Sequence, residues 1–177
     1  SKNSSGYDNI PVDIVKLSIN CISPHLTRII NKSFSDGCVP NLLKIGKVCP
    51  IFKSGDKSNI SNYRPISVLP TFSKIFEKLV YNRLLNYLTR HSVLYQHQYG
   101  FRSNHSTSMA VLEMVDKITE AIDNNKFSLG IFIDLSKAFD TLDHKILFKK
   151  LEYYGIRGVA LSWFKSYLQN CKQYNVV

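Results

Sequence analysis

The sequence predicts a single domain that mixes α-helices with a few strands. Of its 177 residues, 44% are apolar and 20% are charged, which is typical of globular rather than disordered chains. Two long stretches repeat apolar residues with the helical period and so predict amphipathic helices. Residues 127–134 are almost continuously apolar, as in a strand buried on both faces. These patterns fit an α+β fold and a doubly wound α/β sheet equally well.

Five helices are predicted from apolar periodicity and from residues that favour helix ends. Ser23 is a suitable N-cap, Pro24 suits the first helical position, and Gly37 suits the stop. The expected ranges are about 24–37, 71–89, 106–124, 143–154 and 159–169. The third helix has an apolar face that we expect to be buried, formed by Ala110, Val111, Met114, Ile118 and Ile122.

Shorter strands are predicted near both ends of the chain. Residues 47–53 (KVCPIFK) form one, and Pro50 favours an edge position because proline cannot donate to a sheet. The polar residues 54–62 then predict a loop. The last six residues, KQYNVV, resemble the start of another strand.

The positive charge is concentrated in one third of the chain. The formal net charge is +10, and between Lys44 and Arg102 ten Lys and Arg residues face two acids, Asp56 and Glu77. Such a segment suits a nucleic-acid phosphate backbone. A solvated basic surface without a partner explains it equally well.

Nothing in the sequence favours a secreted or membrane protein. No apolar run approaches the ~20 residues of a membrane span, and SKNSSGYDN lacks the regions of a signal peptide. The four cysteines form no C-x-x-C pair and predict reduced thiols in an intracellular protein. They are Cys21, Cys38, Cys49 and Cys171.

Asp134 is the first candidate site residue. It ends the apolar stretch 127–134, and α/β folds place catalytic and metal-binding carboxylates at the ends of buried strands. Asp140 and Asp143 follow, but Asp143 equally suits an N-cap, and Asp140 could accept hydrogen bonds in the turn. Position alone therefore leaves structural roles open for these acids.

The segment IFIDLSKAFDTLDHKILFKKLEYYGI resembles motif A of reverse transcriptases from LINE-type (non-LTR) retrotransposons. The resemblance implies that Asp134 binds catalytic Mg²⁺, with Mn²⁺ as a possible substitute. It places the backbone of Ile133 and Leu135 near the incoming triphosphate. Phe139 would be the steric gate that excludes a ribose 2′-OH, although ordinary core packing is the alternative for this ring.

Two earlier segments are similar to the fingers motifs of the same family. VCPIFKSGDKSNISNYRPISVLP implies that Lys53 and Arg64 contact the incoming triphosphate. Lysine offers a compact charge, and an arginine fork can hold two phosphate oxygens. HQYGFRSNHSTSMAV implies that Gly100, Phe101 and Arg102 lie against the template. Polar template contacts are further expected from Asn104, His105 and Ser106, with His105 equally explained as a loop residue. Residues 6–16 resemble the family's N-terminal extension.

The family implies an α+β architecture of right-hand polymerase fingers and a partial palm, helix-rich with a small, mostly antiparallel sheet. Residues 1–177 would be a partial reverse transcriptase domain, with fingers over about 1–125 and the start of the palm over about 126–177. The implied partners are an RNA template, a DNA primer and deoxynucleoside triphosphates, without a membrane. The location would be intracellular, in the nucleus or the cytoplasm.

Two further motifs of the family do not occur in these 177 residues. They are the Tyr-x-Asp-Asp hairpin and the Gln-Gly pair before it. Two-metal nucleotidyl transfer needs ions ~3.5–4 Å apart, which one aspartate cannot hold. We therefore expect this chain alone not to polymerise. Two other functions stay open: a non-catalytic module that binds RNA or RNA/DNA hybrids, and a phosphotransfer protein with Asp134 as acceptor.

Overall fold

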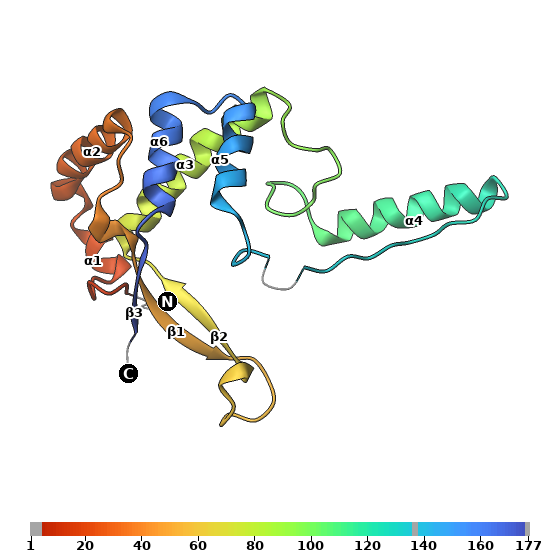
Figure 1. Ribbon diagram of the computed structural model, residues 1–177, viewed down its shortest axis with the longest axis horizontal. Helices are drawn as coiled ribbons and strands as arrows, with labels where there is room; N and C mark the ends of the chain where they lie inside the picture. Colours follow the sequence, from red (N-terminus) through yellow and green to blue (C-terminus); the bar gives the residue numbers. More distant parts are fainter. Residues whose placement is uncertain (1–4, 136–137, 176–177) are drawn as a thin grey trace. The chain divides into compact units, whose positions relative to one another are not determined.

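The computed structural model describes residues 5–135 and 138–175 (Figure 1). Helices and strands alternate irregularly along this part of the chain. In order they are α1 (Val12–Leu17), α2 (Ile19–Asp36), the 3₁₀ turn η1 (Asn41–Lys44), β1 (Ile45–Phe52), the 3₁₀ turn η2 (Ile60–Asn62), β2 (Tyr63–Val68), α3 (Thr71–Arg90), α4 (Thr107–Asp123), α5 (His144–Tyr153), α6 (Gly158–Leu168) and β3 (Lys172–Asn175).

The chain forms two compact units. Unit 1 comprises Ser1–Arg83 and Asp143–Val177, and unit 2 is the continuous stretch Leu84–Leu142. The boundary between them falls within α3. All strands of the described residues belong to unit 1.

The sheet of unit 1 has the strand order β2-β1-β3 (Figure 1). β1 pairs with β2 antiparallel, from Lys47↔Val68 to Phe52↔Tyr63. It pairs with β3 in parallel, from Ile45↔Lys172 to Val48↔Asn175. The helix-rich α+β fold with a small sheet is thus confirmed, with the longer of the two pairings antiparallel.

The edge position expected for Pro50 is wrong, because β1 is the central strand. Among the described residues its pairing with β3 runs from Ile45 to Val48, so no described residue of β3 lies opposite Pro50. On the other side, Pro50 lies opposite Pro65 of β2, so the two residues that lack a backbone N–H form one pair of the β1–β2 ladder.

The core of unit 1 joins α2, α3 and α6. Its buried residues are Ile30, Val39, Phe76 and Trp163. The ring of Phe34 meets both Phe76 and Trp163 edge to face, with centroids 6.5 and 5.9 Å apart. The Trp163 indole N–H donates to Ser33 Oγ over 3.1 Å, and that hydroxyl donates to the Cys38 carbonyl over 2.5 Å. The aromatic cluster therefore also satisfies its own polar groups.

Most predicted helices are confirmed, and one begins earlier than expected. α3 begins at Thr71 as predicted, and α4 follows the Ser106 cap, whose Oγ accepts from the Met109 N–H. α2 begins at Ile19 instead of Pro24, which lies inside the helix. Proline removes one backbone donor there, a loss that the burial of Ile30 and Phe76 in the shared core outweighs. Gly37 ends α2 with a left-handed φ of 63°, as expected.

Two predictions for unit 2 are wrong. Residues 127–134 form no strand, and the exposed fractions are 89% for Leu129 and 82% for Phe132. The apolar face of α4 is exposed as well, with Val111 at 51% and Ile122 at 65%. A strand needs a neighbouring strand for its hydrogen bonds, and among the described residues no strand pairs with this segment. The apolar side chains of these two segments, which the sequence predicts to be buried, are therefore exposed among the described residues.

Across the described residues, no helix combines the length and apolar character needed to span a bilayer.

Candidate nucleotide and nucleic-acid interface

Lys53 and Arg64 lie together on the β1–β2 hairpin of unit 1. Arg64 is opposite Ile51 in the register, and Lys53 is two residues beyond Ile51. The Lys53 N–H donates to the Asn62 carbonyl over 2.8 Å, which extends the ladder to this residue. Alternation along strands therefore places both side chains on the same face, as diagonal neighbours roughly 7–8 Å apart. Both are exposed, so two cationic groups face solvent side by side.

The loop of this hairpin is held by its own hydrogen bonds. The Asn62 side chain donates to the Asp56 carbonyl over 2.8 Å, and the Tyr63 hydroxyl donates to the Lys57 carbonyl over 3.0 Å. Asp56 accepts from the Ser58 N–H, and this hydrogen bond lowers the pKa of the Asp56 carboxyl. Gly55 has φ 94°, and a Cβ there would lie 2.7 Å from Asn62 Nδ2. The loop that separates Lys53 from Arg64 is thus held by hydrogen bonds within the chain.

In unit 2, Phe101 and Phe139 are brought into contact. Their rings meet edge to face, with centroids 6.2 Å apart and an interplanar angle of 86°. The exposed fractions are 84% for Phe101 and 78% for Phe139, so ordinary core packing does not explain either ring. Phe101 also has φ 59°, a conformation that costs a bulky residue about 1–3 kcal/mol. The fold therefore holds an exposed aromatic ring in a conformation that lowers its stability.

Arg102 binds its own loop. Its Nη1 donates to the carbonyls of Tyr95 and Gln96, over 3.0 and 3.5 Å, and the side chain is half-buried. Gly100 is exposed, and a Cβ there would meet nothing within 4 Å. Because a guanidinium carries five N–H donors, Arg102 can fasten the loop and still offer donors to a ligand. A hollow of about 550 Å³ borders it, lined also by Thr89, Ser92 and Tyr95.

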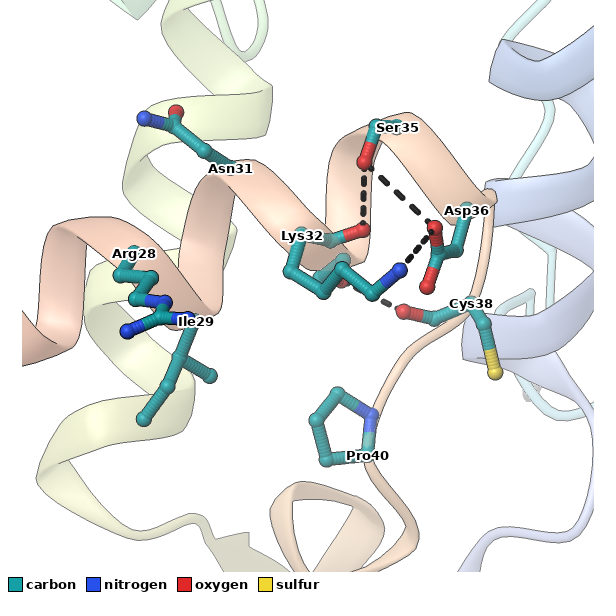
Figure 2. Close-up of a pocket in the computed structure, with 9 residues that line it drawn as sticks. Arg28, Ile29, Asn31, Lys32, Ser35, Asp36, Cys38 and Pro40 are labelled. Atoms are coloured by element: carbon teal, nitrogen blue, oxygen red, sulfur yellow. Dashed lines mark hydrogen bonds and ion pairs between the residues drawn. The ribbon is translucent and has the colours of Figure 1, made fainter.

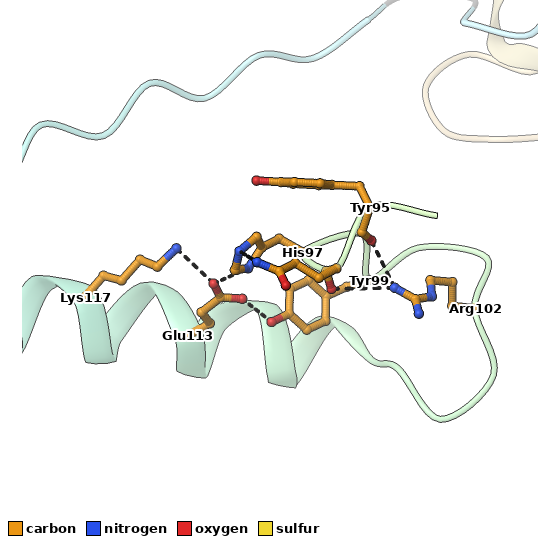
Figure 3. Close-up of polar contacts among 7 residues, drawn as sticks. Tyr95, His97, Tyr99, Arg102, Glu113 and Lys117 are labelled. Carbon is orange, nitrogen blue, oxygen red and sulfur yellow. Dashed lines mark hydrogen bonds and ion pairs between the residues drawn. The ribbon is translucent and has the colours of Figure 1, made fainter. Parts of the chain in front are cut away.

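A cluster that the sequence analysis missed lies next to this loop, centred on Glu113 of α4 (Figure 3). Tyr99, His97 and Lys117 all direct polar groups at its carboxylate. A single glutamate on a helix surface carries no sequence signal for such a role. Its partners Tyr99 and His97 lie on a loop whose path only the structure gives.

The acids of the predicted motif A differ in their surroundings. Asp134 is exposed, as are Ile133 at 82% and Leu135 at 70%. Asp143 is the N-cap of α5 and accepts from the Lys145 and Ile146 N–H groups, over 2.7 and 3.4 Å. Within residues 5–135 and 138–175, no three acids, histidines or cysteines gather as metal ligands. Asp134 can therefore supply one carboxylate ligand but does not form a complete Mg²⁺ site with the described residues.

Three other predicted template residues have local structural roles. Asn104 has φ 60°, His105 Nδ1 lies 3.0 Å from the Ser103 carbonyl oxygen, and Ser106 caps α4. Asn104 thus has a left-handed backbone, which asparagine tolerates, while His105 and Ser106 have contacts within the chain.

The basic segment is largely but not wholly available to solvent. Lys57, Lys74, Lys78 and Arg90 are exposed. Lys44, however, is buried, and its Nζ donates to the Ser166 carbonyl over 3.0 Å. Arg83 lies over the Phe34 ring at 4.6 Å. The expectation of a phosphate-binding role therefore does not extend to Lys44.

A hollow of about 760 Å³ lies along the C-terminal half of α2 (Figure 2). Lys32 and Asp36 form an ion pair over 3.1 Å at its wall, and the Ser35 hydroxyl donates to the Lys32 carbonyl. These polar groups satisfy one another across one turn of helix. None of the candidate residues named above lines this hollow.

Comparisons with known proteins identify the family. The family profile described as Reverse transcriptase (RNA-dependent DNA polymerase) matches residues 52–177. The chain is 33% identical to the "Probable RNA-directed DNA polymerase from transposon BS" of Drosophila melanogaster, over 96% of this chain and 19% of that protein. It is 31% identical to the RNA-directed DNA polymerase from mobile element jockey of the same species, over 84% and 16%. It is also 26% identical to the Retrovirus-related Pol polyprotein from type-1 retrotransposable element R2 of Popillia japonica, over 85% and 20%.

The chain thus spans about one fifth or less of the length of these curated relatives. The family profile, in contrast, covers well over half of the chain. The chain therefore belongs to the reverse transcriptase family, in the branch of the LINE-type (non-LTR) retrotransposons.

Proposed function

We propose that this chain provides nucleotide and template contacts in an RNA-directed DNA polymerase of a non-LTR retrotransposon. The observation that carries the proposal is the shared face of Lys53 and Arg64 on an ordered hairpin. Two exposed cations at this spacing can bind different phosphates of one triphosphate, and the Arg64 fork can hold two oxygens of one phosphate. An ordered loop reduces the entropy lost when the ligand binds.

In unit 2 we base the proposed roles on the exposed ring pair formed by Phe101 and Phe139. Phe139 acts as the steric gate, and Phe101 presents a ring on which a template base can stack. Gly100 leaves room for close approach of the template, and Arg102 holds the loop that carries Phe101. The backbone of Ile133 and Leu135 borders the incoming triphosphate.

Asp134 is proposed as one ligand of catalytic Mg²⁺, for which Mn²⁺ can substitute. When bound, the metal pair would neutralise the charge that develops on the transferred phosphoryl group. Carboxylate oxygen is the ligand type that Mg²⁺ prefers. Among the described residues no three acids, histidines or cysteines gather as metal ligands, so we expect no metal-dependent primer extension from this 177-residue chain alone.

We assign the regions of the chain by analogy with the family. Residues of about 1–125 would be the fingers with an N-terminal extension, and about 126–177 the start of the palm. The partners are an RNA template, a DNA primer and deoxynucleoside triphosphates. These substrates are proposed for the longer polymerases of which such a chain forms a part.

The test is equilibrium binding of a deoxynucleoside triphosphate to the purified chain. Lys53→Ala and Arg64→Ala should each weaken binding about tenfold or more, the effect of one charge-assisted hydrogen bond. Arg64→Lys should restore only part of the loss, because lysine has no fork. Lys149→Ala removes an exposed charge from α5 and serves as the control. Equal effects of all three alanine variants would contradict the proposal, because binding would then depend only on the overall positive charge.

The second candidate is a module that binds RNA or RNA/DNA hybrids without catalysis. The exposed cations Lys53, Lys57 and Arg64 favour it. This function predicts binding that weakens steeply with salt, with a slope that falls by about 1 when one phosphate contact is removed. RNA binding of this kind without measurable nucleotide binding would favour the second candidate over the first.

A further inference from the structure

The Glu113 carboxylate is the hub of a polar cluster in unit 2 (Figure 3). The Tyr99 hydroxyl donates to its Oε2. His97 Nδ1 lies 2.5 Å and Lys117 Nζ 2.9 Å from its Oε1. The Glu113 side chain is 24% exposed, and both of its carboxylate oxygens have partners. A surface glutamate with three partners from two segments differs from an ordinary solvated charge.

Two of these partners belong to the loop 95–102, which carries Gly100, Phe101 and Arg102. Glu113 is on α4, so the Tyr99 and His97 contacts fasten the middle of the loop to a helix. Arg102 closes the loop on itself through the Tyr95 and Gln96 carbonyls. Between the two attachments the chain passes through the left-handed φ of Phe101, whose ring stays 84% exposed.

The strained conformation of Phe101 persists only if its surroundings hold it in place. Releasing the loop from α4 would let Phe101 return to a relaxed backbone and move its ring. The attachment at Glu113 is therefore one of the contacts that hold this loop, beside the ring contact between Phe101 and Phe139, although Glu113 itself contacts Tyr99 and His97 and not Phe101.

We infer that Glu113 is a positioning residue for nucleic-acid binding, which fixes the loop 95–102 so that Phe101 is held ready for a single-stranded template. The inference rests on the proposed function of this loop in template binding. It adds a residue of α4 that touches no substrate and acts through Tyr99 and His97.

The alternative explanation is that Glu113 acts on nucleic acid only through its charge, and the two explanations predict opposite signs. Replacing a carboxylate with a neutral amide in a basic protein strengthens attraction to phosphates. Loss of positioning weakens binding instead. Glu113→Gln also frees the Lys117 ammonium, which would strengthen binding further if charge alone mattered.

The experiment compares the full chain with Glu113→Gln and with Asp116→Asn, by binding of a short single-stranded RNA oligonucleotide at fixed salt. Asp116 is an exposed acid on the same helix, so its variant removes the same charge without touching the loop. We expect Glu113→Gln to lose roughly tenfold in affinity, the size of one charged hydrogen bond. Asp116→Asn should bind equally well or more tightly. Tyr99→Phe should weaken binding in the same direction, and Glu113→Asp should recover part of the loss.

Amide hydrogen exchange provides a readout independent of RNA. In Glu113→Gln, peptides from residues 95–102 should lose protection, whereas peptides from α6 in unit 1 should not change. Unchanged protection of 95–102 in both Glu113→Gln and Tyr99→Phe, or tighter RNA binding by Glu113→Gln, would overturn the inference. If the wild-type chain binds no RNA, the proposed function fails, and the exchange data alone decide whether Glu113 positions the loop.

Discussion

At the scale of single residues, Glu113 is the carboxylate whose ionisation the fold favours most clearly. The hydrogen bond from Tyr99, and after it the Lys117 ammonium, lower the pKa of Glu113 from 4.5 to about 2. The positive charge that His97 can carry acts in the same direction. The same contacts raise the pKa of Tyr99 and of Lys117. Each group therefore favours the protonation state that keeps the cluster together.

The pH dependence of the cluster follows from the sign of this shift. Because the pKa of Glu113 is lower in the folded chain, its ionised form adds stability above pH 4.5. That contribution is lost as the pH falls from about 4.5 toward about 2. Carboxyl ¹³C NMR of Glu113 should give a midpoint of about 2, and Tyr99→Phe should move it up toward 4.5. Tyr95→Phe is the control, since Tyr95 makes no contact with the carboxylate, and a wild-type midpoint near 4.5 would contradict the geometry.

The candidate site could be predicted residue by residue only where a local pattern carries the signal. Lys53, Arg64 and Phe139 stand in short motifs, and the structure adds that Lys53 and Arg64 share one face. Glu113 could not be found, because its role depends on a loop about fifteen residues away in sequence that folds back onto α4. The structural role of Arg102 could not be predicted either, because every residue has a backbone carbonyl and the sequence does not show which one accepts from the guanidinium.

At the scale of elements, one hydrogen-bonded chain fastens α2 to α6 in unit 1. Trp163 of α6 donates to Ser33 of α2, and Ser33 donates to the Cys38 carbonyl after the helix. Ser33 is 5% exposed and Trp163 4%, so the hydrogen bond between them is buried. The link spans 130 residues of sequence and joins the two segments from which unit 1 is built.

Removing the Ser33 hydroxyl should destabilise unit 1. Ser33→Ala leaves the Trp163 N–H buried without an acceptor, at a cost of about 1–3 kcal/mol in the free energy of unfolding. Urea unfolding can be followed by the fluorescence of Trp163, the only tryptophan in the sequence. Ser35→Ala, on the exposed side of the same helix, should change the free energy of unfolding by less than about 0.5 kcal/mol. Equal effects of the two variants would show that the buried hydrogen bond contributes nothing.

Helices were more predictable than strands, for a physical reason. A helix satisfies its hydrogen bonds within one segment, so periodicity and caps such as Ser106 and Gly37 locate it. A strand depends on its neighbour. The sequence predicts no strand over Tyr63–Val68, which contains a proline, yet this segment forms β2 and pairs along its whole length with β1. Residues 127–134 have the composition of a buried strand but pair with no strand among the described residues.

At the scale of the whole molecule, unit 2 leaves much apolar side-chain surface uncovered. Residues 127–135 include Phe127, Leu129 and Ile131, all more than three-quarters exposed. A continuous exposed run of this kind exceeds what monomeric proteins usually show, and an extended segment also offers unpaired backbone groups. Self-association of the isolated chain is the expected consequence.

A charge placed within this run should reduce self-association. Leu129→Lys introduces a cation at a position that is 89% exposed, so the fold of unit 1 should be unaffected. Sedimentation velocity over a range of concentrations should show less oligomer than the wild type shows. Ile60→Lys adds the same charge at an isolated position that is 87% exposed and should leave association unchanged. A wild-type chain that stays monomeric throughout would refute this account of the run.

The discontinuity of unit 1 has a consequence for the order of events on the ribosome. β1 gains its parallel partner β3, and Ser33 its indole donor, only after the whole of unit 2 has been synthesised. At about 5–20 residues per second, the first segment of unit 1 waits several seconds with its core open while unit 2 emerges. During that interval the nascent chain exposes the apolar surface of α2 and α3 that Trp163 of α6 later covers, and exposed apolar surface of this kind makes a partly synthesised chain prone to aggregate.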